Sequence, residues 1–188
     1  MTINKIETKI RSTVEDKLRT DTEVYEAGSG RTFTIACSNV QAVTSVAVNG
    51  TTLATNLYTY ASQTVTINVG SVTSGDVVSI TFTYYKYSTA ELLDFIKSAL
   101  VYLDSYNYSI HFDLSADETE VYPIPQVKEQ SLIVMVASIL IRPDFVSYST
   151  GTVSVRYPNK LSKEERIEKL ILKFSHDRIG CNTILDLS

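Results

Sequence analysis

The chain has 188 residues, enough for one domain or two small ones, and carries a formal net charge of −4 from 17 basic and 21 acidic residues. This mildly acidic balance argues against a protein held to nucleic acid by a basic surface. The N-terminus lacks the apolar core of a signal peptide. Cys37 and Cys181 are far apart in the sequence and match no metal-ligand or redox spacing, so we expect two free thiols in a protein made in a reducing cytoplasm.

The first predicted element is an amphipathic helix at the N-terminus. Apolar residues recur every three or four positions while charged residues fill the other faces, which is typical of a helix with one buried stripe. We expect this helix to end near Thr20 and Asp21. Its apolar stripe consists of Ile3, Ile6, Ile10, Val14 and Leu18.

The composition changes abruptly after this helix. Only six charged residues occur from Asp21 to Lys86, and short runs of alternating apolar and polar residues replace the helical period. Asn49–Gly50 is a strong signal for a two-residue hairpin turn, and turn residues recur often, as in small β-sandwiches and barrels. We expect about five to seven strands here, with a strand near Val24–Tyr25 pairing with Tyr84–Tyr85 so that the two ends of the region meet.

A second helix is predicted from Ser88 to about Ser105. Ser88 and Glu91 have the spacing of a capping box, in which each side chain accepts a hydrogen bond from the other residue's backbone N–H group. Residues 109–124 are acidic and show no period, so we expect an irregular loop. The acidic run does not match the spacing of a calcium-binding loop, and a solvated loop is favoured over a cation site.

The most apolar stretch of the chain is Gln126–Arg142, which lies between Pro125 and Pro143. Apart from Ser138, Leu132–Ile141 is apolar on every face, and a helix that is apolar all round is buried all round. A membrane span needs about 20 apolar residues, more than this stretch supplies. We therefore predict a central helix with other helices packed around it.

The C-terminal part predicts a hairpin, a helix and an apolar tail. Two alternating runs flank Thr150–Gly151, which favours a β-hairpin or an extended loop of similar length. Ser162 and Glu165 have the spacing of another capping box at the start of a charged helix. The tail, residues 181–188, is rich in large aliphatic residues and has nothing of its own chain to pack on, so we expect it to dock on a neighbouring molecule.

Together these elements predict an α+β protein. Its architecture is a small α-helical bundle around a buried central helix, with an all-β, sandwich-like domain inserted between the first and second helices. Residues 1–20 and 88–188 form the helical domain of this prediction, and residues 21–87 form the inserted domain.

Residues suited to catalysis or metal binding are scarce. His111 and His176 have no Cys, Asp or His partner at a metal-ligand spacing, and the chain contains neither a glycine-rich phosphate loop nor a nucleophile elbow. We assign no catalytic, metal or cofactor residue and do not expect an enzyme. Tyrosines at helix ends and in the hairpin suit a protein interface, because the ring is apolar and the hydroxyl is polar.

The helical part resembles the head–tail connector or adaptor proteins of tailed bacteriophages. The resemblance rests on the very apolar middle helix, the extended hairpin, the charged helix and the loose tail, and it covers residues 1–20 and 88–188. The inserted region, with Val46–Leu53 and Ser74–Tyr84, is similar to small β-modules of phage tail and neck proteins. The insertion is a departure, since the simplest connectors are nearly all helical.

The resemblance implies a structural protein of the virion neck, assembled in the host cytoplasm. It implies a ring of about twelve copies beneath the portal protein, built by head-to-tail contacts that close. Such a ring extends the DNA channel and offers a platform for another neck or tail protein. DNA would pass without sequence-specific binding, which fits the negative charge, and neither a membrane nor a cofactor is implied. The candidate contacts to portal or subunit are Phe145, Tyr148, Gly151, Arg156, Tyr157, Ile184, Leu185 and Leu187.

Two alternatives remain open. One is a phage tail or baseplate module whose β-domain recognises another virion protein or a host glycan, which an exposed aromatic cluster on one β face would support. The other is a small enzyme, which would need a pocket with carboxylates or a histidine of shifted pKa.

Overall fold

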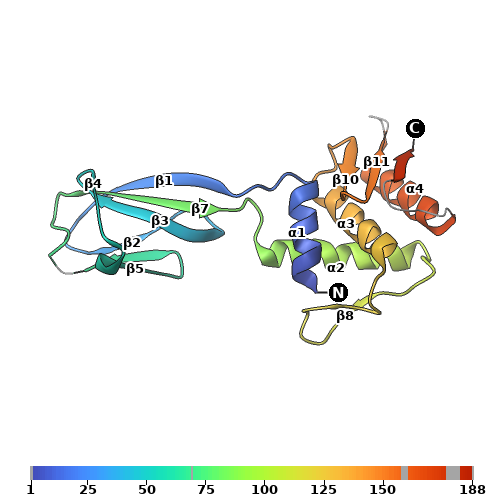
Figure 1. Cartoon of the computed structure of the whole chain (residues 1–188), viewed down its shortest axis with the longest axis horizontal. Helices are drawn as coiled ribbons and strands as arrows, with labels where there is room; N and C mark the ends of the chain where they lie inside the picture. The colour runs from blue at the N-terminus through green and yellow to red at the C-terminus, as the bar shows by residue number, and fades with distance from the viewer. Residues whose placement is uncertain (1, 69, 158–160, 177–182, 188) are drawn as a thin grey trace. The chain divides into compact units, whose positions relative to one another are not determined.

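The computed structural model describes residues 2–68, 70–157, 161–176 and 183–187. Within these residues the chain forms four α-helices, one short 3₁₀ helix and twelve strands in four sheets (Figure 1). It divides into two compact units, which we call the terminal unit (1–16 and 89–188) and the β unit (17–88). The predicted fold class, a helical bundle with one inserted β-domain, is wrong. Two of the four described sheets belong to the terminal unit, and strands outnumber helices in the described chain.

The β unit contains a four-stranded and a three-stranded sheet that share one apolar core. The larger sheet has the order β1–β7–β3–β4 and the smaller one the order β2–β6–β5. Alternate residues of a strand point to the same face, so Val46, Ile80 and Phe82 of the larger sheet share a core with Val65 and Ile67 of the smaller sheet. The elements are β1 (Arg19–Glu26), β2 (Thr32–Thr34), β3 (Val40–Val48), β4 (Thr51–Thr52), η1 (Thr55–Leu57), β5 (Tyr58–Ala61), β6 (Thr64–Ile67) and β7 (Val77–Tyr84).

The first and last strands of the β unit lie side by side. β1 pairs antiparallel with β7, and the register places Arg19 opposite Tyr84 and Val24 opposite Ser79. The sequence therefore predicts which segments pair but not their register. Asn49 and Gly50 form the turn between β3 and β4, with φ angles of 49° and 79°, a backbone conformation that Asn and Gly adopt readily. Because β1 and β7 are neighbours, the chain enters and leaves this unit through adjacent strands.

Helix α3 (Val127–Ile141) is the centre of the terminal unit. It contacts α1, α2 and α4, and most of its residues are buried on every face, as the apolar run predicts. The hydroxyl groups of Ser131 and Ser138 donate to backbone carbonyls one turn back, at 3.0 and 2.7 Å, so these two buried hydroxyls are satisfied within the helix. The other helices are α1 (Ile3–Thr13), α2 (Thr89–Ser105) and α4 (Lys163–His176).

Helix α1 ends earlier than the sequence predicts. The apolar stripe is buried as far as Val14, but Leu18 lies beyond the helix and is 52% exposed. Glu15 has a positive φ of 58°. The backbone N–H of Asp16 donates to the carbonyl of Arg11 at 2.8 Å, and the two side chains form an ion pair. The left-handed residue turns the chain away from the helix axis, and the residues that follow form β1 instead of more helix.

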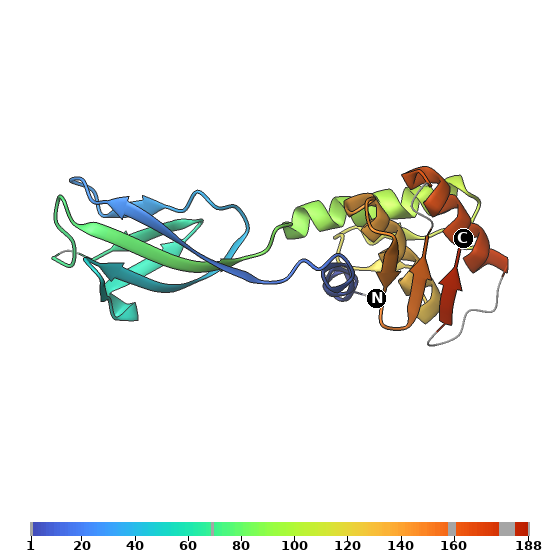
Figure 2. The same cartoon turned by 90° about the horizontal axis from the view of Figure 1, so that it is seen from above.

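Two small sheets of the terminal unit are not predicted by the sequence as sheets. Residues 109–124, expected to be irregular, contain the hairpin of β8 (Asp113–Leu114) and β9 (Val121–Tyr122). β10 (Ser147–Ser149) and β11 (Val153–Arg156) form the hairpin that the sequence favours, and β12 (Thr183–Asp186) pairs parallel with β11. The expectation that the tail has nothing of its own chain to pack on is therefore wrong. Cys181 lies outside the described residues. Figure 2 shows β10, β11 and β12 side by side.

Candidate functional site

The predicted contact residues gather on the sheet of β10, β11 and β12. β10 and β11 are joined by a turn at Gly151, whose φ is 80°, and β12 extends the sheet on the other side of β11. Side chains alternate between the two faces of such a sheet. Tyr148 and Leu185 are buried on the inner face, while the outer face carries serines together with Arg156 and Ile184.

An aromatic cluster supports the inner face of this sheet. The ring centroids of Phe145 and Tyr148 are 6.1 Å apart, and those of Tyr148 and Tyr157 are 6.1 Å apart at an interplanar angle of 76°. The guanidinium of Arg142 lies 3.9 Å from the Phe145 ring centroid, and its backbone carbonyl accepts a hydrogen bond from the Tyr148 hydroxyl. Burial raises the pKa of Tyr148 to about 12 and also raises the pKa of Tyr157. Both hydroxyls are therefore neutral at physiological pH, and the cluster serves packing.

A buried arginine fastens the hairpin to α4. Arg166 is 4% exposed, and its guanidinium donates to the backbone carbonyls of Pro143 at 2.6 Å, Phe145 at 2.7 Å and Leu161 at 3.0 Å. No carboxylate pairs with it among the described side chains, so carbonyl dipoles take the place of an ion pair. Sequence reasoning did not single out Arg166. The sequence does place it one turn before Leu170, on the apolar face of α4, and a charged residue on that face is a sign of a buried side chain.

The structure divides the eight predicted contact residues into two groups. Four have side chains that pack within the chain: Tyr148 (1% exposed), Tyr157 (3%), Leu185 (5%) and Leu187 (8%). Four remain partly or fully accessible: half-buried Phe145, exposed Gly151 and Arg156, and Ile184, which is 79% exposed. A partner that binds this sheet without unfolding it can therefore touch only the second group.

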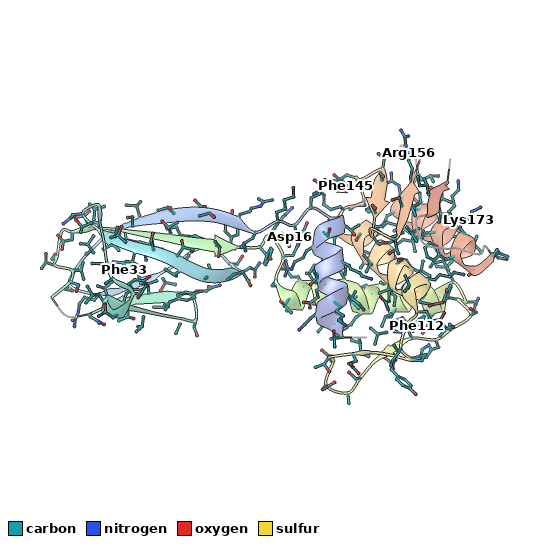
Figure 3. All side chains as sticks on the ribbon, in the orientation of Figure 1. Asp16, Phe33, Phe112, Phe145, Arg156 and Lys173 are labelled. Carbon is teal, nitrogen blue, oxygen red and sulfur yellow. The ribbon has the colours of Figure 1, made fainter. Side chains whose placement is uncertain are left out.

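β12 is an edge strand of the described sheet. The N–H of Leu187 donates to the carbonyl of Arg156 at 3.0 Å, and in a parallel pair the backbone groups of alternate residues point to the same neighbour. The backbone groups of Ile184 therefore point away from β11. We call Arg156, Ile184 and this outer edge the β12 surface. Figure 3 shows the Arg156 side chain pointing away from the sheet.

Among the side chains that the structure describes, residues suited to catalysis do not converge on this sheet. No group of three or more His, Cys, Asp or Glu side chains in the described residues is placed to hold a metal ion. Nδ1 of His111 lies 2.6 Å from a carboxylate oxygen of Asp104, and this hydrogen bond raises the pKa of His111. Nδ1 of His176 lies 2.8 Å from the backbone carbonyl of Leu172. As for membranes, none of the described helices is long and apolar enough to span one.

The aromatic side chains of the β unit do not form a platform for a sugar. All of those in residues 17–68 and 70–88 are buried or half-buried, and Tyr25 packs on Phe33 with ring centroids 5.5 Å apart. Short side chains cover the outer face of the larger sheet instead, such as Thr22 and Thr81, whose hydroxyl oxygens are 3.0 Å apart. The exposed aromatic cluster that a glycan-binding alternative calls for is absent from the described residues of this unit.

Comparisons with known proteins identify no family or function for this chain. No protein-family model matches the chain, and no curated protein matches it. The function is therefore argued from the described surface and from its chemistry.

Proposed function

We propose that the chain is a structural virion protein, a head–tail connector of a tailed bacteriophage. In this proposal copies of the chain form a ring beneath the portal protein, extend the DNA channel and offer a docking platform for a neck or tail component. The observation that carries the proposal is the β12 surface. Ile184 is 79% exposed beside an exposed arginine, at an unpaired edge of the described sheet, and burying such a residue against another protein is favourable.

The side chains packed beneath the β12 surface hold its backbone in place, which suits a rigid protein-binding surface. The aromatic cluster and Arg166 fix the sheet from below, so binding would require little ordering of the backbone. The net charge of −4 also suits a channel, because a basic lumen would retain DNA through phosphate contacts. A role of the β unit in recognising another virion protein belongs to the same proposal. Its half-buried aromatic side chains give no support to recognition of a host glycan.

The mass of the assembly tests this function. The chain is purified and examined by light scattering, native mass spectrometry and negative-stain imaging, alone and mixed with the portal protein encoded by the same genome. We expect a closed ring of about twelve copies, formed alone or on the portal, with the portal by itself as the control. A chain that stays monomeric in both settings would overturn the proposal.

A further inference from the structure

Charged side chains are almost missing from the middle of the β unit. From Ala27 to Gly75 the sequence contains one charged residue, Arg31. This stretch supplies the whole of the smaller sheet, β2–β6–β5. Arg31 directly precedes β2 and is half-buried, and none of the described Asp or Glu side chains pairs with it. A positive charge without a counter-charge therefore lies beside a sheet that is otherwise neutral.

Arg31 lines an open hollow where β2 begins and β6 ends. The hollow has a volume of about 620 Å³, within the range of ligand-binding sites. The other polar side chains around it are exposed and uncharged, and they belong to Ser29, Thr32, Thr66 and Asn68. Hydroxyl and amide groups around one guanidinium can hydrogen-bond a polar ligand, but they add no second charge.

A face of exposed threonines adjoins the hollow. The register places Thr32 opposite Thr66 and Thr66 opposite Thr59, so these three side chains cross the smaller sheet in one row. All three are exposed. Their hydroxyls can both donate and accept hydrogen bonds, and their short side chains leave room for another chain to lie across the sheet. We call this row and the hollow together the Arg31 surface.

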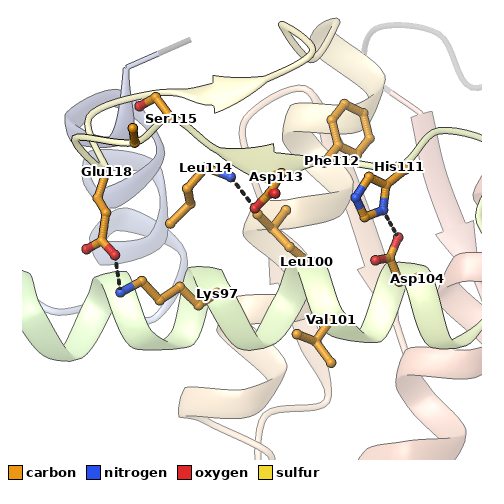
Figure 4. Close-up of a pocket in the computed structure, with 11 residues that line it drawn as sticks. Lys97, Leu100, Val101, Asp104, His111, Phe112, Asp113, Leu114, Ser115 and Glu118 are labelled. Carbon is orange, nitrogen blue, oxygen red and sulfur yellow. Dashed lines mark hydrogen bonds and ion pairs between the residues drawn. The ribbon is translucent and has the colours of Figure 1, made fainter.

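The groove between α2 and the β8 hairpin, drawn in Figure 4, contains no comparable cation. Nζ of Lys97 is 2.8 Å from Oε1 of Glu118, and Nδ1 of His111 is 2.6 Å from Oδ1 of Asp104, as the dashed lines mark. The basic side chains of this groove are thus already engaged by carboxylates. Arg31 differs from them because its charge is available to a ligand.

The single charge of Arg31 narrows the class of ligand. A guanidinium binds a carboxylate or a phosphate through two parallel N–H···O hydrogen bonds. A phosphate group on a protein carries about −1.5 to −2 charges and is typically bound by a cluster of arginines, and nucleic acid also requires several cations. One arginine instead balances the single charge of a carboxylate.

The open shape of the hollow indicates that this carboxylate belongs to a large molecule. Sites for small molecules bury roughly 70–90% of the ligand surface, whereas a small acid in this hollow would remain largely in water. A carboxylate on an extended protein segment is different, because the rest of the segment can lie on the threonine row and hydrogen-bond to its hydroxyls.

We propose that the Arg31 surface binds an acidic segment of another protein. Arg31 holds an Asp or Glu carboxylate of that segment, and Thr32 and Thr66 hydrogen-bond to the polar groups beside it. The inference goes beyond the proposed ring, whose β12 surface lies in the terminal unit, and it gives the β unit a partner of its own.

Binding of a labelled peptide tests the class of ligand. The full chain is titrated into a fluorescein-labelled, C-amidated peptide of alternating serine and glutamate, and into a twin peptide with glutamine in place of glutamate. We expect fluorescence anisotropy to show about tenfold tighter binding of the glutamate peptide, because hydrogen bonds to charged groups are the stronger ones. Unlabelled glutamate peptide should displace it, whereas acetate or inorganic phosphate at the same concentration should not. Equal binding of the two peptides, or displacement by either small anion, would overturn the inference.

Substitutions in the β unit test the place of binding. Arg31→Gln should abolish the preference for the glutamate peptide, while Arg19→Gln, the same change at an exposed position of β1, should preserve it. Thr66→Glu should also block binding, since it places a carboxylate of the chain itself beside the hollow. Thr59→Glu, in the same row but outside the hollow, is its matched control. Binding that survives Arg31→Gln, or that is lost equally in Thr66→Glu and Thr59→Glu, would overturn the inference.

The subunit count separates this inference from the proposed function. Native mass spectrometry of the same samples reports ring formation independently of peptide binding. A chain that forms rings but has no preference for the glutamate peptide would overturn the inference alone. A chain that binds the peptide through Arg31 but stays monomeric, alone and with portal protein, would overturn the ring alone.

Discussion

Arg166 and Arg156 lie in neighbouring elements but face different surroundings. Arg166 is 4% exposed and donates to three backbone carbonyls, whereas Arg156 is exposed on the outer face of the sheet. A buried donor cannot be removed without leaving its acceptors unpaired, while an exposed side chain leaves nothing buried behind. Stability should therefore depend on Arg166, and association should depend on Arg156.

Replacing Arg166 with alanine should lower the free energy of unfolding of the terminal unit by about 3 kcal/mol, because three buried carbonyls lose their donor and the packed side-chain stem is lost. Arg156→Ala, the matched control, should change it by less than about 0.5 kcal/mol. Urea unfolding followed by the helical circular dichroism signal measures both. Equal effects of the two substitutions would contradict this assignment.

Glu23 links β1 to the segment that follows β2. Its carboxylate accepts hydrogen bonds from the backbone N–H groups of Ala36 and Cys37, each at 2.9 Å, and from the Tyr25 hydroxyl. Burial acts to raise the pKa of Glu23, but the hydrogen bonds from Tyr25, Ala36 and Cys37 outweigh it, and the pKa is lowered. A carboxylate with a lowered pKa adds stability above its ordinary value of 4.5. That stability is lost as pH falls through the folded-state pKa.

Glu23→Gln should weaken the β unit at neutral pH by about 1–2 kcal/mol, since a neutral amide accepts these hydrogen bonds less strongly than a carboxylate. The difference from the parent chain should shrink as pH falls below 4.5, because the parent then loses the same stabilisation. Hydrogen exchange of the Ala36 and Cys37 amides measures the local effect, with Glu26→Gln at the exposed end of β1 as the control. A difference that does not change with acidification would count against this role.

Among the elements, the sequence predicts α3 well and the short strands poorly, because a long element shows a clear apolar pattern and a short one does not. α3 has 15 residues with a continuous apolar run, which only a buried helix accommodates. β8, β9 and β12 have two to four residues each, too few to show alternation, and pairing with distant residues stabilises them. The same limit applies to the site. The apolar tail pointed to Ile184 and Leu185 together, but only the register against β11 decides that one is exposed and the other buried.

The edges of the sheets differ in how they oppose association. β1 is an edge strand of the β unit and carries several charged side chains, and the N–H of Thr22 donates to the carboxylate of Asp21 at 2.8 Å. Charged side chains on an edge discourage pairing with another chain. The β12 edge instead presents an exposed isoleucine. Of these two edges, the β12 edge is therefore the better suited to association with another chain.

Alanine substitutions at two adjacent residues of β12 separate the stability of this strand from its proposed contact. Leu185→Ala should lower the free energy of unfolding by about 2–3 kcal/mol, because a 5% exposed side chain leaves a cavity. Ile184→Ala should change it by less than about 0.5 kcal/mol while weakening self-association. Urea unfolding and the mass of the assembly measure the two effects. Loss of folding stability in Ile184→Ala would show that this side chain packs within its own chain.

The two units of the molecule each have a core of their own. The β unit has its own core, in which Phe33, Val65 and Phe82 are buried together, and the terminal unit is built around α3. The β12 surface belongs to the terminal unit. Ring formation should therefore not require the β unit, which leaves that unit available for another partner.

Replacing residues 20–83 with a short Gly-Ser linker between Arg19 and Tyr84 should leave the terminal unit folded and able to associate. Arg19 lies opposite Tyr84 in the paired strands, and residues paired in this way have Cα atoms about 4.5–5.5 Å apart. A linker of about three or four residues spans that gap. We expect helical circular dichroism and a subunit count equal to that of the full chain, while residues 17–88 alone should give a folded β monomer. A terminal unit that folds but stays monomeric would place part of the subunit contact in the β unit.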